Sequence, residues 1–332
     1  MPLWLVLLLA YLFEFANGWT DAPNSIATVV STRVLRPHHA VIMAGVLNLA
    51  GALLIGTAVA KTIAAGIVDP QQVTLETVAA SLLAATIWAL GAQYFGLPSS
   101  ESHALVAALL GSGFAAGGLG ALEWEGTRKS LIGLVTSPVG GFLGGFLLMV
   151  LVYRLFARVR RPVVRRIFGR AQVLSAAFMA LSHGTGDGQK TMGVITLAVL
   201  LDRAGSAGRI PSEFPIPTWV IVSAGVVMGL GTMVGGWRVV RTMGLRMTHL
   251  EPVQGFAAET AAATVITAAA RLGIPVSTTH AIGTSIMGVG ATRRFSAVRW
   301  GVAGQVVAAW ILTWPSCAVL AYLLERAFRL VL

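Results

Sequence analysis

The sequence predicts an all-α, polytopic transmembrane helical bundle built from two inverted-topology repeats, with interrupted or re-entrant helices. Three observations carry this prediction: the composition, the spacing of apolar runs, and a pair of polar motifs that occurs twice. The 332 residues are 56% hydrophobic and 11% charged, with a mean hydropathy of +0.78. Soluble domains contain about a quarter charged residues. We therefore expect a multi-pass protein of the cell membrane, surrounded by lipid bilayer.

Apolar runs of spanning length occur along the whole chain, and each needs roughly 20 residues to cross a bilayer. They fall at about 3–32, 40–60, 73–95, 98–118, 130–153, 172–200, 216–237, 252–270, 274–291 and 300–324. Two of them begin at Pro98 and Pro275, only a few residues after the preceding run. Proline in a first turn, shortly after glycine, indicates a helix that is interrupted and restarted. These two segments either span fully or re-enter, and both possibilities stay open.

The runs divide the chain into a first transmembrane repeat (1–153), a basic cytoplasmic linker (154–171) and a second repeat (172–332). An odd number of spans in each half would give the halves opposite orientations. With the N-terminus outside, the predicted inside segments hold 15 basic residues and the outside segments hold 7. The positive-inside rule therefore favours outside termini and an inside linker. Seven arginines lie in that linker and explain much of the net charge of +11, so no nucleic-acid partner is expected.

A polar motif pair occurs once in each half, in the same order. It consists of Gly18-Trp19-Thr20-Asp21-Ala22-Pro23-Asn24 followed by Pro98-Ser99-Ser100-Glu101-Ser102-His103, and Gly184-Thr185-Gly186-Asp187-Gly188-Gln189-Lys190 followed by Pro275-Val276-Ser277-Thr278-Thr279-His280. A duplicated polar site inside an apolar chain is typical of a transporter built from two repeats around a central substrate.

Asp21 and Asp187 are the first candidates for function, because a carboxylate within a membrane span costs several kcal/mol. The structural alternative is an ion pair, and Lys190, one turn beyond Asp187, is an available partner. Carboxylate and amide oxygens suit a hard cation such as sodium, and a carboxylate can also carry a proton. We therefore assign cation coupling to Asp21, Asn24, Asp187 and Glu101, with Asp21 and Asp187 as the metal ligands if the cation is sodium.

The hydroxyl clusters predict a different role, because each begins a helix. The first amides of a helix have no partner within it, and the helix dipole is positive at that end. Two such helix starts facing one another could hold one tetrahedral oxyanion. The predicted anion ligands are Ser99, Ser100, Ser102, Ser277, Thr278 and Thr279, with backbone amides. The alternative is ordinary N-capping.

Five further residues are assigned supporting roles: His103, His280, Gln189, Lys190 and Glu259. Each histidine directly follows a hydroxyl cluster, although a histidine in a span is often a hydrogen-bonded core residue. Glu259 lies within an apolar run, where an ionisable residue is again a functional candidate.

The quoted residues resemble the PiT family of inorganic phosphate transporters. The likeness covers nearly the whole chain and is carried by several separate motifs in order. They are Ser182-His183-Gly184 through Asp187 to Gly193, Pro275 to His280, Gly235-Gly236-Trp237, Arg241 to Gly244, and Glu251-Pro252 with Gly255-Phe256. The resemblance implies a cation-coupled phosphate symporter with inverted repeats.

Three positions depart from the pattern of that family. Thr20 and Gly186 stand where relatives carry Asn or His before each aspartate, which removes possible cation ligands. Glu101 stands where relatives commonly carry Ser or Thr. A negative charge beside an anion is unfavourable unless it is protonated or paired.

The function expected from the sequence is secondary active transport of inorganic phosphate, coupled to protons or sodium. Sulfate, or another tetrahedral oxyanion, is the nearest alternative substrate. An anion channel is less favoured, because paired intramembrane carboxylates suit a coupled cation. An intramembrane hydrolase is also less favoured, because a catalytic site needs one nucleophile and one base rather than duplicates. No enzyme activity and no cofactor are expected, and a homo-oligomer is possible.

Overall fold

The chain folds into a bundle of long helices. The computed structural model describes residues 1–54, 56–207 and 214–331. Its α-helices are α1 (Leu3–Ser31), α2 (Pro37–Leu54), α3 (Ala58–Gly66), α4 (Leu75–Phe95), α5 (Glu101–Gly117), α6 (Trp124–Leu155), α7 (Arg161–Ala207), α8 (Thr218–Val234), α9 (Trp237–Arg241), α10 (Pro252–Arg271), α11 (Thr278–Ala291) and α12 (Trp300–Val331). Short 3₁₀ segments η1 (Gly118–Ala121) and η3 (Phe295–Ala297) and a π-helical turn η2 (Thr242–Arg246) join them.

Within the described residues, six helices are long and apolar enough to cross a membrane: α1, α2, α4, the α5–η1 segment, α6 and α12. The bent pair formed by α8 with α9–η2 adds a seventh span if it counts as one. On α6, large apolar side chains are exposed at every fourth position, at Leu131, Val135, Val139, Leu143, Leu147 and Leu151. Neighbouring members of this row lie about one turn apart, and the row winds gradually around α6. The helix therefore presents large apolar side chains over much of its surface, as expected where a helix meets lipid. The predicted all-α membrane architecture is confirmed.

Two predicted runs are broken within the structure. The run at 40–60 divides into α2 and the separate short helix α3, with Gly56 between them at φ 81°. The run at 216–237 ends at Val234, where Gly235 takes φ 73° and the chain bends by 59° into α9. Because positive φ is strained for residues with a Cβ, glycine lets the helix stop at each break.

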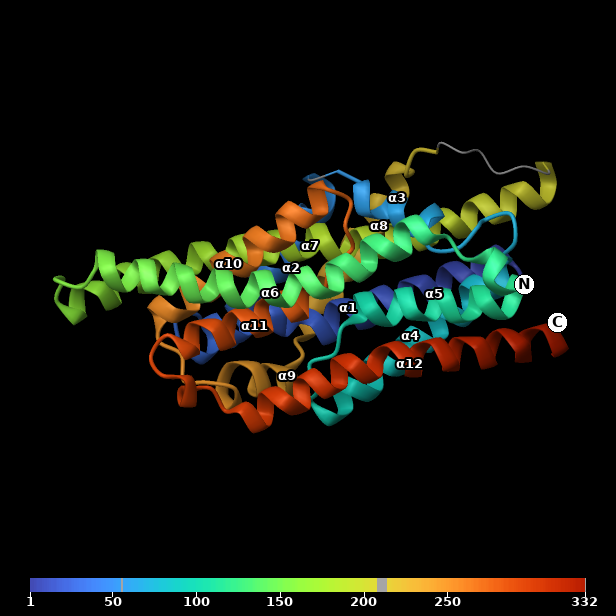
Figure 1. Ribbon diagram of the computed structural model, residues 1–332. Helices are drawn as coiled ribbons and strands as arrows, with labels where there is room; N and C mark the ends of the chain where they lie inside the picture. The colour runs from blue at the N-terminus through green and yellow to red at the C-terminus, as the bar shows by residue number, and fades with distance from the viewer. Residues whose placement is uncertain (55, 208–213, 332) are drawn as a thin grey trace.

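The basic segment 154–171 is helical for most of its length. Helix α6 ends at Leu155 and α7 begins at Arg161, so α7 carries most of the predicted linker as its first turns. All seven arginines of the segment are exposed. Figure 1 shows the α6–α7 connection at one end of the molecule and both chain termini at the other end. This separation is the one expected if the termini lie on one side of the membrane and the linker on the other.

Helix contacts recur in matched pairs between the halves. Helix α1 packs on α8 as α7 packs on α2, and α5 packs on α12 as α11 packs on α6. Glycines at equivalent positions allow these approaches: a Cβ on Gly18 would lie 2.3 Å from the Met228 carbonyl oxygen, and one on Gly184 would lie 2.1 Å from that of Asn48. Gly111 and Gly288 make equally close approaches to α12 and α6. Larger residues at these positions would force the helices apart.

Helices α5 and α11 begin near the centre of the molecule. The rings of His103 and His280, in their first turns, are 4.7 Å apart, and the two helices then extend toward opposite ends (Figure 1). Helix α11 has 14 residues and is about 21 Å long, which is shorter than a bilayer core. The length of α11 therefore favours a re-entrant segment, whereas the α5–η1 segment is long enough to span.

The apolar core is divided into two clusters. Phe13 of α1 and Met192 of α7 belong to one, and Ile26 of α1 and Met179 of α7 belong to the other. Asp21 and Asp187 lie between these positions on the same two helices. The packing therefore places a polar region between two apolar ones.

Candidate substrate and cation site

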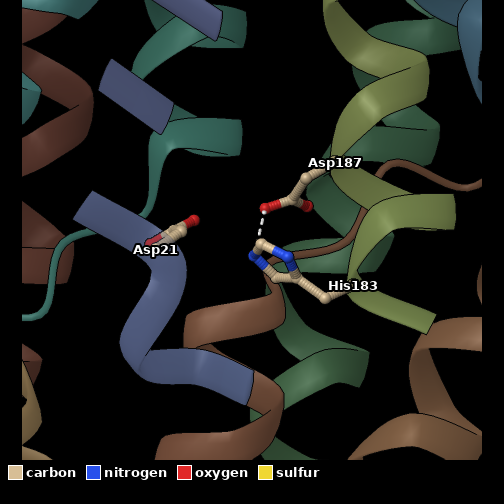
Figure 2. Close-up of side chains that lie close together, drawn as sticks. All are labelled: Asp21, His183 and Asp187. Carbon is tan, nitrogen blue, oxygen red and sulfur yellow. Dashed lines mark ion pairs between the residues drawn. The ribbon is translucent and has the colours of Figure 1, made fainter. Parts of the chain in front are cut away.

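The two motif aspartates meet where α1 and α7 lie side by side. Oxygen atoms of Asp21 and Asp187 and a ring nitrogen of His183 all lie within 4.8 Å of one another. Figure 2 shows Asp187 and His183 projecting from α7 toward Asp21 on α1. His183 Nε2 is 3.3 Å from Asp187 Oδ2, and its Nδ1 is 3.3 Å from Asn48 Oδ1. Two carboxylates and an imidazole at this spacing can hold a cation or share a proton.

Lys190 connects this group to the other half of the molecule. Its ammonium group forms an ion pair with Asp187 on the same helix and donates to the Ser102 hydroxyl at the start of α5. The structural alternative raised by the sequence, an Asp187–Lys190 pair, is therefore present. It does not exclude function, because the same lysine reaches the first hydroxyl cluster.

Asn24, at the position in the first motif that corresponds to Lys190, makes the matching connection. Its side-chain amide donates to Thr278 at 3.1 Å and to Thr279 at 2.9 Å, both on α11. Thr278 donates in turn to Asp187, and Thr279 donates to Asp21, each at 3.0 Å. Each aspartate motif thus binds the hydroxyl cluster of the opposite half. We call the joined residues the central cluster: Asp21, Asn24, Ser102, His183, Asp187, Lys190, Thr278 and Thr279.

Ser100 and Ser277 act as helix N-caps. The Ser100 hydroxyl accepts from the His103 amide at 3.3 Å, and the Ser277 hydroxyl accepts from the His280 amide at 3.1 Å. The capping alternative therefore describes the position of these two hydroxyls. Ser102, Thr278 and Thr279 are the predicted anion ligands that contact the central cluster instead.

Glu101 lies beside the central cluster and is buried. Its Oε1 accepts from Thr20 at 3.0 Å and from Ser99 at 2.9 Å, so Ser99 contacts Glu101. Its Oε2 is buried with no hydrogen-bond partner among the described residues. A carboxylate with one satisfied oxygen and one orphaned oxygen is a ready acceptor for a proton.

His103 and His280 form an aromatic pair at the start of α5 and α11. Trp310 packs against His280 with the two rings tilted and their centroids 3.9 Å apart, and it donates its indole N–H to the Pro98 carbonyl at 2.8 Å. The ring nitrogens of both histidines are buried, and none has a hydrogen-bond partner among the described residues. The pair therefore lies where the two helices begin, and its four ring nitrogen atoms have no hydrogen-bond partner among the described residues.

Gln189 and Glu259 lie outside the central cluster. The Gln189 side-chain oxygen accepts from the Val59 amide at 2.9 Å and so caps the start of α3. Glu259 accepts from Thr28, Ser175 and Gln172 in a separate buried polar group. Gln189 therefore contacts α3 rather than the central cluster. Glu259 contacts Thr28 of α1, about two helical turns from Asp21.

The central cluster is closed to solvent. Asp21 is 3% exposed and Asp187 is 0% exposed, and the other members are buried as well. Among the described residues, the buried carboxylates include Glu14, Asp21, Glu101, Asp187 and Glu259, whereas Lys190 is the only buried lysine or arginine. Negative groups therefore exceed positive ones around the site, and a bound anion would increase this excess.

Comparison with known proteins identifies the family of this arrangement. A family model described as the phosphate transporter family matches residues 17–321. The chain belongs to the phosphate transporter family. The resemblance found in the sequence is thereby confirmed.

Two family members in bacteria are similar over nearly their whole length. A probable low-affinity inorganic phosphate transporter of Rhizobium meliloti (strain 1021) is 47% identical over 97% of this chain and 95% of the relative. A protein of the same description in Bacillus subtilis (strain 168) is 42% identical over 95% of this chain and 94% of the relative. A solved structure titled the sodium-dependent phosphate transporter matches with a TM-score of 0.90 and 25% identity, covering 99% of each chain.

Two buried residues of this family member were not among the sequence candidates. His183 is four residues before Asp187, a spacing that puts both side chains on one helix face. Glu14 lies in an apolar run two turns before Asp21. Helical spacing relative to each aspartate is therefore the sequence signal for both residues.

Proposed function

We propose that this protein imports inorganic phosphate across the cell membrane together with a cation, either sodium or a proton. The observation that carries the proposal is the set of hydrogen bonds by which the central cluster joins the two halves of the chain. Each motif aspartate accepts from a hydroxyl at the start of α11, while Lys190 and Asn24 reach the hydroxyl clusters of the opposite halves. The phosphate transporter family and the names of the relatives support the same substrate.

The anion would bind where α5 and α11 begin. The first-turn amides of both helices lack intrahelical partners, and both helix dipoles are positive there. Ser102, Thr278 and Thr279 add hydroxyls, and Lys190 adds a positive charge. Phosphate differs from sulfate in carrying a proton that it can donate, so a carboxylate such as Asp21 would favour phosphate.

The cation would bind at the carboxylates, because they outnumber the buried positive groups. Asp21 and Asp187, with His183, offer ligand atoms close enough for one sodium ion, and the sodium-dependent structural relative supports that ion. Glu101 offers a proton acceptor. In either case an anion enters a region that already has excess negative charge, so its binding requires a compensating cation. Because the cluster is buried, the halves must move relative to one another to open it.

The Thr279 hydroxyl provides a test of the anion site. Thr279→Val should weaken phosphate binding by at least about tenfold, because one hydrogen bond to a charged group is worth about 1.5–3 kcal/mol. Ser277→Ala is the matched control: it removes an N-cap and should lower stability by about 1 kcal/mol while changing the phosphate Kd by less than about twofold. Equilibrium binding in detergent, with sulfate as competitor, measures both. A phosphate Kd unchanged by Thr279→Val, or equal affinity for sulfate, would argue against the proposal.

The Glu101 carboxylate provides a test of the coupling ion. If Glu101 carries the coupled proton, uptake into sodium-free proteoliposomes should rise as the outside is acidified, because protonation neutralises the charge beside the anion. Glu101→Gln should remove most of that rise. A Ser99→Ala variant, which keeps the carboxylate, should retain it. Uptake that requires sodium and ignores an imposed pH gradient would exclude the proton and leave sodium at Asp21 and Asp187.

A further inference from the structure

Polar side chains form a continuous stripe along one face of α1. Glu14, Asn17, Asp21, Asn24 and Thr28 follow one another at alternating steps of three and four residues, and all five are buried. This spacing places them on one helix face. The central cluster uses the middle of the stripe, and Thr28 joins it to Glu259 at one end. Glu14 and Asn17 form the other end, about 10 Å and about 6 Å along the helix from Asp21 at 1.5 Å per residue.

Glu14 contacts α7 through Thr191. The Thr191 hydroxyl donates to Glu14 Oε2, and the Asn17 amide donates to the same oxygen at 3.3 Å. Thr191 lies one turn beyond Asp187, so the group is adjacent to the central cluster without being part of it. Glu14 forms no ion pair among the described residues, and the nearby ammonium group of Lys190 is directed to Asp187 and Ser102.

Two oxygen atoms of this group are left without partners. Glu14 Oε1 and Asn17 Oδ1 are both buried, and neither has a hydrogen-bond partner among the described residues. Glu14 is 0% exposed and Asn17 is 2% exposed, so bulk water does not satisfy them. Buried polar atoms are ordinarily paired, and two orphaned acceptors on neighbouring side chains indicate a missing positive or donor species.

We propose that Glu14, Asn17 and Thr191 form a second cation site, for sodium, on the side of the central cluster away from Glu259. The carboxylate, amide and hydroxyl oxygens are the ligand types that hard cations prefer. The single carboxylate favours a monovalent ion, because one positive charge leaves the group neutral in an apolar region whereas two would leave it charged. A cation here lies beside α7 one turn from Asp187 and stabilises the α1–α7 contact.

Sodium binding to the purified protein tests this proposal without any transport step. The number of sodium ions bound per chain is measured in detergent with radioactive sodium, without phosphate and with choline keeping the ionic strength constant. Glu14→Gln should lower the number by one. Asp21→Asn, which alters the central cluster, should leave the Glu14 site filled. The result does not depend on the anion, so it stands or fails separately from the proposed phosphate transport.

Matched variants separate a binding site from a structural role. Glu14→Asp keeps the carboxylate and should restore the bound ion with weaker affinity. Thr191→Val should raise the half-saturating sodium concentration of this site at least about tenfold. Thr196→Val removes a buried hydroxyl on the same helix that donates to the Met192 carbonyl, and it should change nothing. An unchanged number of bound ions in Glu14→Gln, or a Glu14 group that takes up only protons, would overturn the proposal.

Discussion

Asp21→Asn and Asp187→Asn should each reduce cation-driven phosphate uptake to the background of protein-free liposomes. Each substitution keeps the shape of the side chain and removes the charge that a coupled cation must neutralise. Asp21 also accepts from Thr279 and Asp187 from Thr278, so both variants disturb the contact between the aspartates and α11. The initial rate of labelled phosphate uptake into proteoliposomes is the measurement.

Asp202→Asn is the control for these variants, because Asp202 is an exposed aspartate on the same helix as Asp187. It should transport at the unmutated rate. All three proteins should elute as single species in size-exclusion chromatography. Uptake close to the unmutated rate in both Asp21→Asn and Asp187→Asn would remove the two carboxylates from the mechanism.

Lys190→Met should have the largest effect on stability. It leaves Asp187 buried without its ammonium partner, and breaking a buried ion pair from one side costs about 3–5 kcal/mol. The midpoint of thermal unfolding in detergent should fall clearly, and phosphate uptake should be lost. Lys129→Met is the matched control, since Lys129 pairs with Glu125 at the surface and exposed pairs contribute about 0–1 kcal/mol.

A double variant separates the two consequences of losing Lys190. Lys190→Met combined with Asp187→Asn removes both members of the ion pair, so Asp187 is no longer left charged without its partner, and stability should recover most of the loss. Transport should stay absent, because both the cation ligand and the positive charge near the anion are missing. A Lys190→Met protein as stable as the unmutated one would show that Asp187 does not depend on this ion pair.

The repeated motifs allowed much of the candidate site to be predicted from the sequence. Asp21, Asp187 and the two hydroxyl clusters were identified because polar residues stand out in apolar runs and because each occurs twice. The contacts between them could not be predicted. Asn24 and Thr278 are separated by 254 residues in the chain, and only the packing of α1 against α11 brings them together. The contacts between the two halves are therefore a property of the tertiary structure and not of the local sequence.

The residue at which each helix begins determines which groups the serine hydroxyls contact. Ser100 and Ser277 could serve as caps or as anion ligands, and the choice depends on the residue at which each helix begins. Because α5 begins at Glu101 and α11 at Thr278, the preceding serines occupy the N-cap positions. Periodicity does not locate a helix start to one residue. The same limit explains why the basic segment 154–171 was expected as a linker, although α7 begins within it.

Labelled phosphate uptake into proteoliposomes, with sodium and proton gradients imposed one at a time, tests cation-coupled phosphate transport most directly. The arrangement of excess carboxylates around a buried anion site predicts accumulation of phosphate above its equilibrium concentration under one of the two gradients. It predicts no accumulation when both are absent, and no comparable accumulation of sulfate. Phosphate that merely equilibrates across the membrane, at a rate independent of both gradients, would contradict coupling and indicate a passive anion pathway instead.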